Sequence, residues 1–244
     1  MSLKKCFSCQ IMLVISVLAL TKSQGQTKDT SFLSSSINNA ISLYHAQINR
    51  AAGIYHGVEY EYYPYHFQEG TPYFVTSDSV AASIYYDGVL YQNMFMKYDQ
   101  LRDQVIIWYN NDAVRLIDEK VDSFIIRDHL FVRLISDSAS KNALATGYYE
   151  MIYNGKIRIY RKSIKHVLVK TDMTEGVIRT IDQKDNYFVR KSGHFQSIDN
   201  VNEWYALFID HKDEIKEFVS RNNLNFKKDP AGWLVQVAAY CDKL

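Results

Sequence analysis

The sequence contains few of the residues that cross-link or interrupt a chain. Its 244 residues include only three cysteines and three prolines. Cys6 and Cys9 lie in the first 25 residues, so Cys241 is the single cysteine of the remaining chain, which excludes an intramolecular disulfide there. No low-complexity tract occurs either. With 47% hydrophobic residues, the chain is expected to be stabilised by a hydrophobic core.

Sequence motifs of common enzymes are also lacking. The chain has no G-x-S-x-G nucleophile elbow, no phosphate-binding loop and no dinucleotide-binding fingerprint. Cys241 lies among apolar residues at helical spacing, as expected of an inert buried thiol. These absences favour a protein that is not an enzyme, has no catalytic residues and needs no cofactor.

An export signal is the most informative feature that the chain does contain. Lys4 and Lys5 precede the apolar run 11–20, and the small residues Ser23 and Gly25 follow it. This order is typical of a signal peptide, here over residues 1–25. The run is shorter than the roughly 20 apolar residues that span a membrane. Cys9 precedes the run, which excludes a lipoprotein anchor. We therefore expect an exported protein, periplasmic or extracellular, with neither a lipid anchor nor a transmembrane segment.

The charge balance excludes one class of partner. Without the predicted signal, the chain has 25 basic and 27 acidic residues. A nearly neutral chain offers no electrostatic attraction for nucleic acid.

Local patterns predict three successive regions. The first is an amphipathic helix over residues 31–50, followed by Gly53. Its apolar positions are Phe32, Ile37, Ala40, Ile41, Tyr44 and Ile48.

The second region, residues 57–198, has short β-branched and aromatic runs separated by turn residues. Connections this short join antiparallel strands. We therefore expect an antiparallel meander of about ten strands, curled into a half-barrel or packed as a sandwich. The expected turns are Asp87-Gly88, Asn110–Asp112, Asn154-Gly155, Asp185-Asn186 and Ser192-Gly193.

The third region, residues 199–244, has helical periodicity. Asp199 or Asn200 can cap a helix start, with Glu203 available for a capping box, and Asp229-Pro230 marks another helix start. Trp204 and Trp233 are expected to be core anchors. The fold class is therefore α+β, mainly β, with one domain over residues 26–244 and its C-terminal helices packed on the sheet.

The tyrosine-rich stretch 58–67 is the most unusual local feature. Strand alternation would place Tyr60 and Tyr62 on one side and Glu59, Glu61 and Tyr63 on the other. Aromatic rings beside carboxylates suit stacking on sugar rings or the mouth of a ligand site. The alternative is that Tyr60 and Tyr62 pack the core with their hydroxyls at its rim.

A second candidate ligand surface is the methionine-rich strand that contains Tyr91, Met94 and Met96. Methionine and aromatic side chains line adaptable apolar cavities, but they fill solid cores equally well.

Other charged groups are better explained without a site. His56 and His66 have glutamates nearby but match no metal motif, and the acids of 172–176 and 182–185 lack the calcium-loop pattern. No metal site is expected. The basic residues of 156–170 could form an anion-binding strip, but they are interpreted as the solvated face of a strand whose Ile157 and Ile159 point inward.

The chain resembles a family of small, exported, functionally unassigned proteins of Bacteroidota. The resemblance lies in YYDGVLYQNMFMKYD (Tyr85–Asp99), in YYEMIYNGKIRIYRK (Tyr148–Lys162), and in DNYFVRKSGHFQSI with EIKEFVSRNNLNFKKD near the C-terminus. These motifs are structural and imply no catalytic or ligand residues. At the level of fold, the order of a helix followed by a meander is similar to that of periplasmic lipoprotein carriers of the LolA type.

Three functions are compatible with these observations. The leading interpretation is a non-enzymatic envelope protein that acts as an interaction or accessory module for another envelope protein. The alternative is a carrier of an apolar, lipid-like ligand at Tyr60, Tyr62, Tyr91, Met94 and Met96. The third is a hydrolase whose site is assembled from residues far apart in the sequence.

Overall fold

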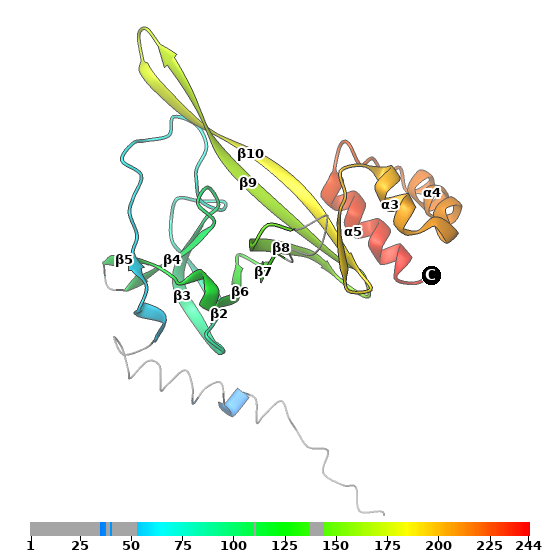
Figure 1. The fold of residues 1–244 in the computed structure, drawn as a ribbon, viewed down its shortest axis with the longest axis horizontal. Coiled ribbons are helices and arrows are strands. Elements are labelled where there is room, and N and C mark those ends of the chain that lie inside the picture. Colours follow the sequence, from blue (N-terminus) through cyan, green and yellow to red (C-terminus); the bar gives the residue numbers. More distant parts are fainter. Residues whose placement is uncertain (1–34, 38–39, 41–52, 110, 137–143) are drawn as a thin grey trace, which may run out of the picture. The chain divides into compact units, whose positions relative to one another are not determined.

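The computed structural model describes residues 35–37, 40, 53–109, 111–136 and 144–244 (Figure 1). Contacts divide the chain into two units, Met1–Gln47 and Ile48–Leu244. In the first unit, residues 35–37 and Ala40 are helical and exposed. The expected signal peptide and the rest of the expected helix 31–50 lie outside the described residues and stay predictions.

The described residues of the second unit form one antiparallel sheet of 11 strands, followed by helices, which confirms the predicted mainly-β class. The strands are β1 (Val58–Glu59), β2 (Val80–Tyr86), β3 (Val89–Asp99), β4 (Gln104–Tyr109), β5 (Asp112–Arg115), β6 (Val121–Ile126), β7 (His129–Leu134), β8 (Gly147–Asn154), β9 (Arg158–Asp172), β10 (Gly176–Lys191) and β11 (His194–Ser197).

The strand order is not that of one continuous meander. It is β1-β5-β4-β3-β2-β6-β7-β8-β9-β10-β11. Strands β2 to β5 advance in one direction. The chain then returns through the 3-10 helix η3 (Asp118–Lys120) and places β6 against the other edge of β2. Another 3-10 helix, η2 (Gly53–Tyr55), precedes β1.

Turn chemistry explains several of the hairpins. Asp87 and Gly88 have φ of 51° and 76°, the positive values that a type I′ turn requires, and Ser192-Gly193 joins β10 to β11. The predicted turn at Asp185-Asn186 is wrong. Strand β10 continues through both residues because each pairs with β9, and the chain reverses after Asp172 instead. The Asp172 carboxylate accepts hydrogen bonds from the backbone N–H groups of Thr174 and Glu175 there.

The sheet curls over its own core. Tyr98 on β3 and Tyr148 on β8 are four strand positions apart, about 19 Å in a flat sheet. Their ring centroids are only 5.8 Å apart. The enclosed core contains Ile84, Met96, Ile107, Phe124 and Phe131, and it is extended by Ile54 and Phe74 from outside the strands.

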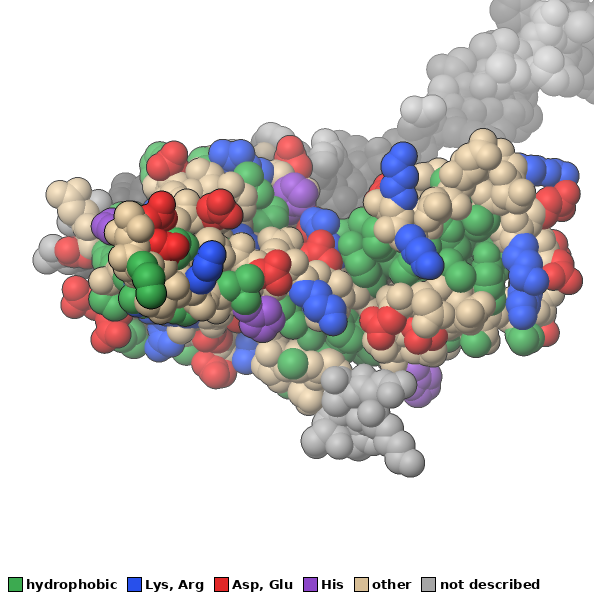
Figure 2. Space-filling model, turned by 90° about the horizontal axis from the view of Figure 1, so that it is seen from above, with side chains coloured by type: hydrophobic (Ala, Val, Ile, Leu, Met, Phe, Trp, Pro, Cys, Tyr) green, Lys and Arg blue, Asp and Glu red, His purple; other side chains and the backbone are tan. Residues whose placement is uncertain are grey.

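Helices α3 (Val201–Leu207), α4 (Lys212–Arg221) and α5 (Pro230–Cys241) build a second core with β8 to β10, as predicted, and η4 (Ile209–His211) joins α3 to α4. Asn200 and Glu203 make the expected capping box, and Asp229 caps α5. Trp204 and Trp233 are buried. On the side where Figure 1 places these helices, Figure 2 shows a broad area of hydrophobic side chains with both basic and acidic side chains around it.

Cys241 belongs to this second core and is buried, as its helical spacing predicted. Burial raises the pKa of its thiol to about 11. Within the described part of the chain, no helix combines the length and hydrophobicity needed to span a bilayer.

Candidate functional site

The candidate site is built around residues 58–77, which we call the tyrosine segment. Only Val58 and Glu59 pair as a strand, and after Tyr60 the chain meets the sheet again only at single bridges, Glu69 with Thr180 and Tyr73 with Asp99. The expected alternation therefore does not continue: Tyr60 is buried, whereas the Tyr62 side chain is 58% exposed. Tyr60 packs with Ile106 and Ala113, which confirms the core interpretation for that residue.

A buried carboxylate holds the segment. Asp99, at the end of β3, is fully buried, and its Oδ2 accepts hydrogen bonds from the hydroxyls of Tyr60 and Tyr63, both at 2.8 Å. Its Oδ1 accepts from the backbone N–H groups of Leu101 and Arg102. A buried carboxylate is costly unless its oxygens are bonded. The hydrogen bonds that Asp99 accepts offset this cost, and they join the tyrosine segment to the β3–β4 turn.

The two tyrosine hydroxyls act as donors in this arrangement. Burial raises the pKa of both Tyr60 and Tyr63, and the neighbouring Asp99 carboxylate raises each pKa further. Both phenols therefore stay protonated at neutral pH and keep donating to Asp99.

A buried lysine supplies a second anchor. Lys165 on β9 is 7% exposed, and its Nζ donates to the backbone oxygens of Thr71 at 2.9 Å and Tyr73 at 2.6 Å. Burial lowers the pKa of Lys165. The interpretation of 156–170 as a solvated face is therefore wrong for Lys165 and for Lys162, although Ile157 and Ile159 point inward as expected. Close tertiary packing, rather than strand alternation, decides where these lysines lie.

Arginines stack on the rings of the segment. The Arg102 guanidinium lies 4.1 Å from the ring centroid of Tyr63 and donates from Nη1 to the backbone oxygen of Glu61 at 2.5 Å. Arg179 lies 4.5 Å from the ring centroid of Tyr65. Cations over ring faces restrict the rings without burying them.

The segment lines a surface cleft of about 400 Å³, which we call the aromatic cleft. This volume falls within the range of small-molecule sites, about 300–1,000 Å³. Its aromatic side chains are Tyr62, Tyr63, Tyr65, His66, Phe67 and Tyr73.

A neighbouring cleft, also of about 400 Å³, has a more polar lining, and we call it the polar cleft. It is formed where β1 meets the β4–β5 edge. Its lining residues are Val58, Glu59, Tyr60, Glu61, Arg102, Gln104 and Arg115.

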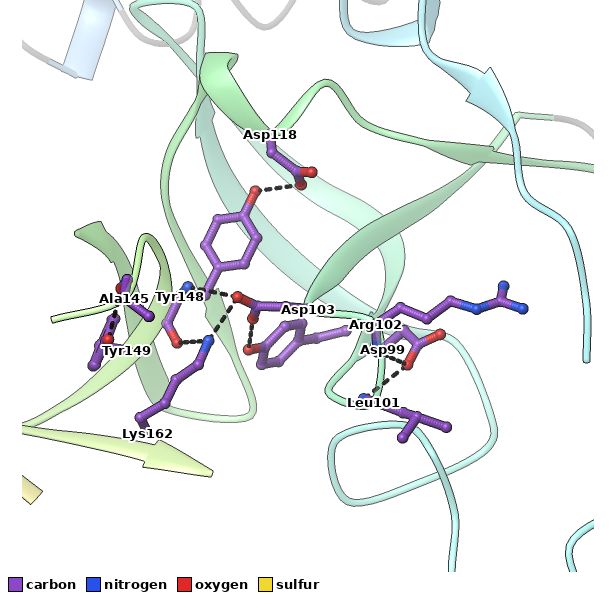
Figure 3. A network of polar contacts seen from close by, with 10 residues as sticks. Asp99, Leu101, Arg102, Asp103, Asp118, Ala145, Tyr148, Tyr149 and Lys162 are labelled. Carbon is purple, nitrogen blue, oxygen red and sulfur yellow. Dashed lines mark hydrogen bonds and ion pairs between the residues drawn. The ribbon is translucent and has the colours of Figure 1, made fainter. Parts of the chain in front are cut away.

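A second polar network fixes the other end of the β3–β4 turn. Figure 3 shows Asp99 and Asp103 at the two ends of this turn. Asp103 accepts from the hydroxyl of Tyr98 at 2.5 Å and from Lys162 Nζ at 2.6 Å. Asp103 also accepts from the backbone N–H of Tyr148 on β8 at 3.3 Å, and the Tyr148 hydroxyl donates to Asp118 at 2.9 Å. The turn that supports the tyrosine segment is therefore tied to β8 and β9 as well.

The structure separates the candidate ligand residues into two groups. Tyr60 and Tyr62 are neighbours with ring centroids 5.3 Å apart, and each lines one of the two clefts. Tyr91 and Met96 are buried in the core enclosed by the sheet, and Met94 packs against that core. A bulge, at which Gln92 and Asn93 lie opposite Ser83, brings Tyr91 and Met94 to the same side.

Sequence patterns missed the residues that organise the site. Asp99, Arg102, Arg115 and Lys165 lie 26 or more positions away from the parts of the segment that they meet. The one available signal was the crowding of tyrosines itself. Among the described residues, no group of three or more His, Cys, Asp and Glu side chains is placed to hold a metal ion.

Comparisons with models of known protein families, with curated proteins and with solved structures found no match.

Proposed function

We propose that this chain is a non-enzymatic binding module of the cell envelope that holds its ligand or partner on the tyrosine segment. The supporting observation is that an irregular surface segment with an exposed Tyr62 is held by the fully buried Asp99. Surface loops usually vary in conformation, and binding residues on loops work best when a rigid scaffold positions them. The buried anchors of this segment supply that rigidity.

Export to the periplasm or the exterior is part of this proposal. It depends on the basic, apolar and small-residue pattern of the first 25 residues. A binding module needs a folded surface in that compartment and no membrane anchor.

The proposal is tested by comparing the protein with two variants as immobilised bait for solubilised cell-envelope material. The first variant combines Tyr62→Ala with Tyr65→Ala in the aromatic cleft. The second, Phe95→Ala, is a matched control because Phe95 on β3 is 59% exposed, close to the 58% of Tyr62, and lines neither cleft. We expect the same polysaccharide or protein to be retained by wild type and Phe95→Ala and lost from the double variant. Equal retention by all three would refute the proposal.

A second candidate, a carrier for an apolar ligand, is favoured by a different surface. Phe95, Tyr85, Leu90 and Ile125 are exposed on the outer face of the paired strands β3, β2 and β6. Exposed apolar side chains gathered on one surface mark interaction sites. Native mass spectrometry of protein purified from its own envelope, followed by lipid extraction, tests this candidate. Stoichiometric lipid that is lost in Phe95→Ala but kept in the double tyrosine variant would support the carrier.

A further inference from the structure

The two clefts of the site adjoin each other. Tyr60 and Arg102 line the polar cleft, and they contact Tyr62 and Tyr63 of the aromatic cleft. Glu61 and Tyr62 are consecutive residues that line different clefts. A ligand with several linked units can therefore reach from one cleft into the other.

The polar cleft offers both hydrogen-bond donors and acceptors. Arg102, Arg115 and Gln104 supply N–H groups, while Glu59 and Glu61 supply carboxylate oxygens. Among the ion pairs of the described residues, none includes Glu59, Glu61, Arg102 or Arg115. Their charged groups are therefore not neutralised by direct pairing within the described chain.

The charge balance of the polar cleft selects among ligand classes. Two arginines and two glutamates give no net charge, so a strongly anionic or cationic ligand meets repulsion as well as attraction. A hydroxyl group donates one hydrogen bond and accepts others, so it can use both kinds of side chain. The polar cleft therefore suits a neutral ligand rich in hydroxyl groups.

The aromatic cleft suits the less polar C–H face of the same hydroxyl-rich ligand. An aromatic ring has a negative face, which attracts the weakly positive C–H groups on the face of a sugar ring. Tyr62 presents an exposed ring, and the neighbouring rings are held by T-shaped contacts such as Tyr63 with Phe67 at 5.3 Å. A sugar ring can pack on Tyr62 without an ordering cost for the segment.

From this combination we infer that the ligand is a neutral oligosaccharide, with one sugar ring packed on Tyr62 and the next held in the polar cleft. This inference rests on the proposed function. In the polar cleft, Arg102, Arg115 and Gln104 donate to sugar hydroxyls, and Glu59 and Glu61 accept from them. An extended peptide and an acidic glycan are the ligand classes that the experiment must separate from a neutral one.

The experiment measures binding of purified protein to neutral hexasaccharides of glucose, mannose, galactose and xylose by calorimetry. Hexagalacturonate and a proline-rich peptide serve as the acidic and peptide probes. We expect at least one neutral hexasaccharide to bind, with an affinity unchanged by added salt because no ion pair forms. We expect Tyr62→Ala and Arg115→Met each to lower that affinity about tenfold, and Phe95→Ala to leave it unchanged.

The outcomes separate the inference from the proposed function. Binding of hexagalacturonate or the peptide alone, lost in Tyr62→Ala, would overturn the neutral-glycan inference and leave a binding module in place. Failure of every neutral hexasaccharide to bind would also overturn the inference. The envelope-bait comparison then decides independently whether the tyrosine segment binds anything.

Discussion

The two halves of the sheet fill their cores in different ways. Around β2 to β7 the sheet curls on itself, and tyrosine hydroxyls from its core bond to aspartates, as in Tyr98 with Asp103 and Tyr148 with Asp118. Around β8 to β10 three helices cover the sheet, and the largest buried side chains are Trp204 and Trp233. The first half combines a core with polar anchors for a surface segment. The second adds apolar packing of the helices to one polar link, in which Asp242 accepts hydrogen bonds from Tyr153 and from the backbone between β8 and β9.

The difference explains where the candidate site lies. A tyrosine has an apolar ring and a polar tip, so it can be buried and still hold a second element through its hydroxyl. Tyr60 and Tyr63 do this through Asp99. The helix-covered half has no corresponding irregular segment among the described residues that buried carboxylates hold at the surface.

The largest expected effect tests the helix-covered half. Trp204→Ala removes a fully buried side chain that stacks on Phe208 and meets Trp233, so we expect the free energy of unfolding to fall by about 3–5 kcal/mol. Denaturant unfolding followed by circular dichroism measures it. The control is Trp108→Ala, a partly exposed tryptophan of the other half, which should cost less. Equal losses would contradict the contrast between the two halves.

Removing the polar anchor of the first half is expected to lower the free energy of unfolding by a somewhat smaller amount. Asp99→Ala leaves two tyrosine hydroxyls and two backbone N–H groups without their acceptor, so we expect a loss of about 2–4 kcal/mol. Ligand binding at the tyrosine segment should disappear with it.

Asp122→Ala on β6 is the control for this change, because Asp122 is exposed. It should alter the free energy of unfolding by no more than about 0.5 kcal/mol. If Asp99→Ala had an effect as small as that of the control, the buried carboxylate would not be an anchor.

The third prediction concerns the pH dependence of the first half. Burial lowers the pKa of Lys162 in the folded chain, with Asp103 acting in the opposite direction, while the ordinary value is 10.5. Between these two pKa values the unfolded chain binds more protons than the folded chain. The contribution of Lys162 to the free energy of unfolding therefore rises with pH through that window.

Lys162→Met removes this contribution. The free energy of unfolding of wild type minus that of the variant should increase as the pH approaches 10.5, measured by denaturant titrations at constant ionic strength. A difference that stays flat with pH would show that Lys162 titrates as an exposed lysine.

The last test introduces no substitution and measures the reactivity of Cys241, which reports on the helix-covered core. Burial raises the pKa of its thiol from 9.0 to about 11, so the thiolate fraction at pH 8 is about a hundredfold lower than for an exposed cysteine. We expect native protein to react with iodoacetamide at least about a hundredfold more slowly than protein unfolded in urea. Rapid labelling, or a disulfide-linked dimer on a non-reducing gel, would contradict the burial of this helix face.

Local features of the fold were predictable. The turns at Asp87-Gly88 and Ser192-Gly193 and the caps at Asn200 and Asp229 follow from residues that lie next to each other in the sequence. The turn at Asp185-Asn186 failed because pairing with β9 outweighed the local preference of these residues. The pairing of β2 with β6 was not predictable, because no local pattern specifies which edge a returning strand chooses.

For the candidate site, the sequence determined the crowding of tyrosines and the choice of residue types that can stack on or bond to a ligand. Only the tertiary structure decided that Tyr60 is buried and donates to Asp99, while Tyr62 is exposed. It also decided that Lys165 on β9 donates to the backbone of the segment. The physical reason is that alternation and periodicity depend on neighbours along the chain. A hydrogen bond between residues 39 positions apart depends on how a curled sheet brings distant strands together.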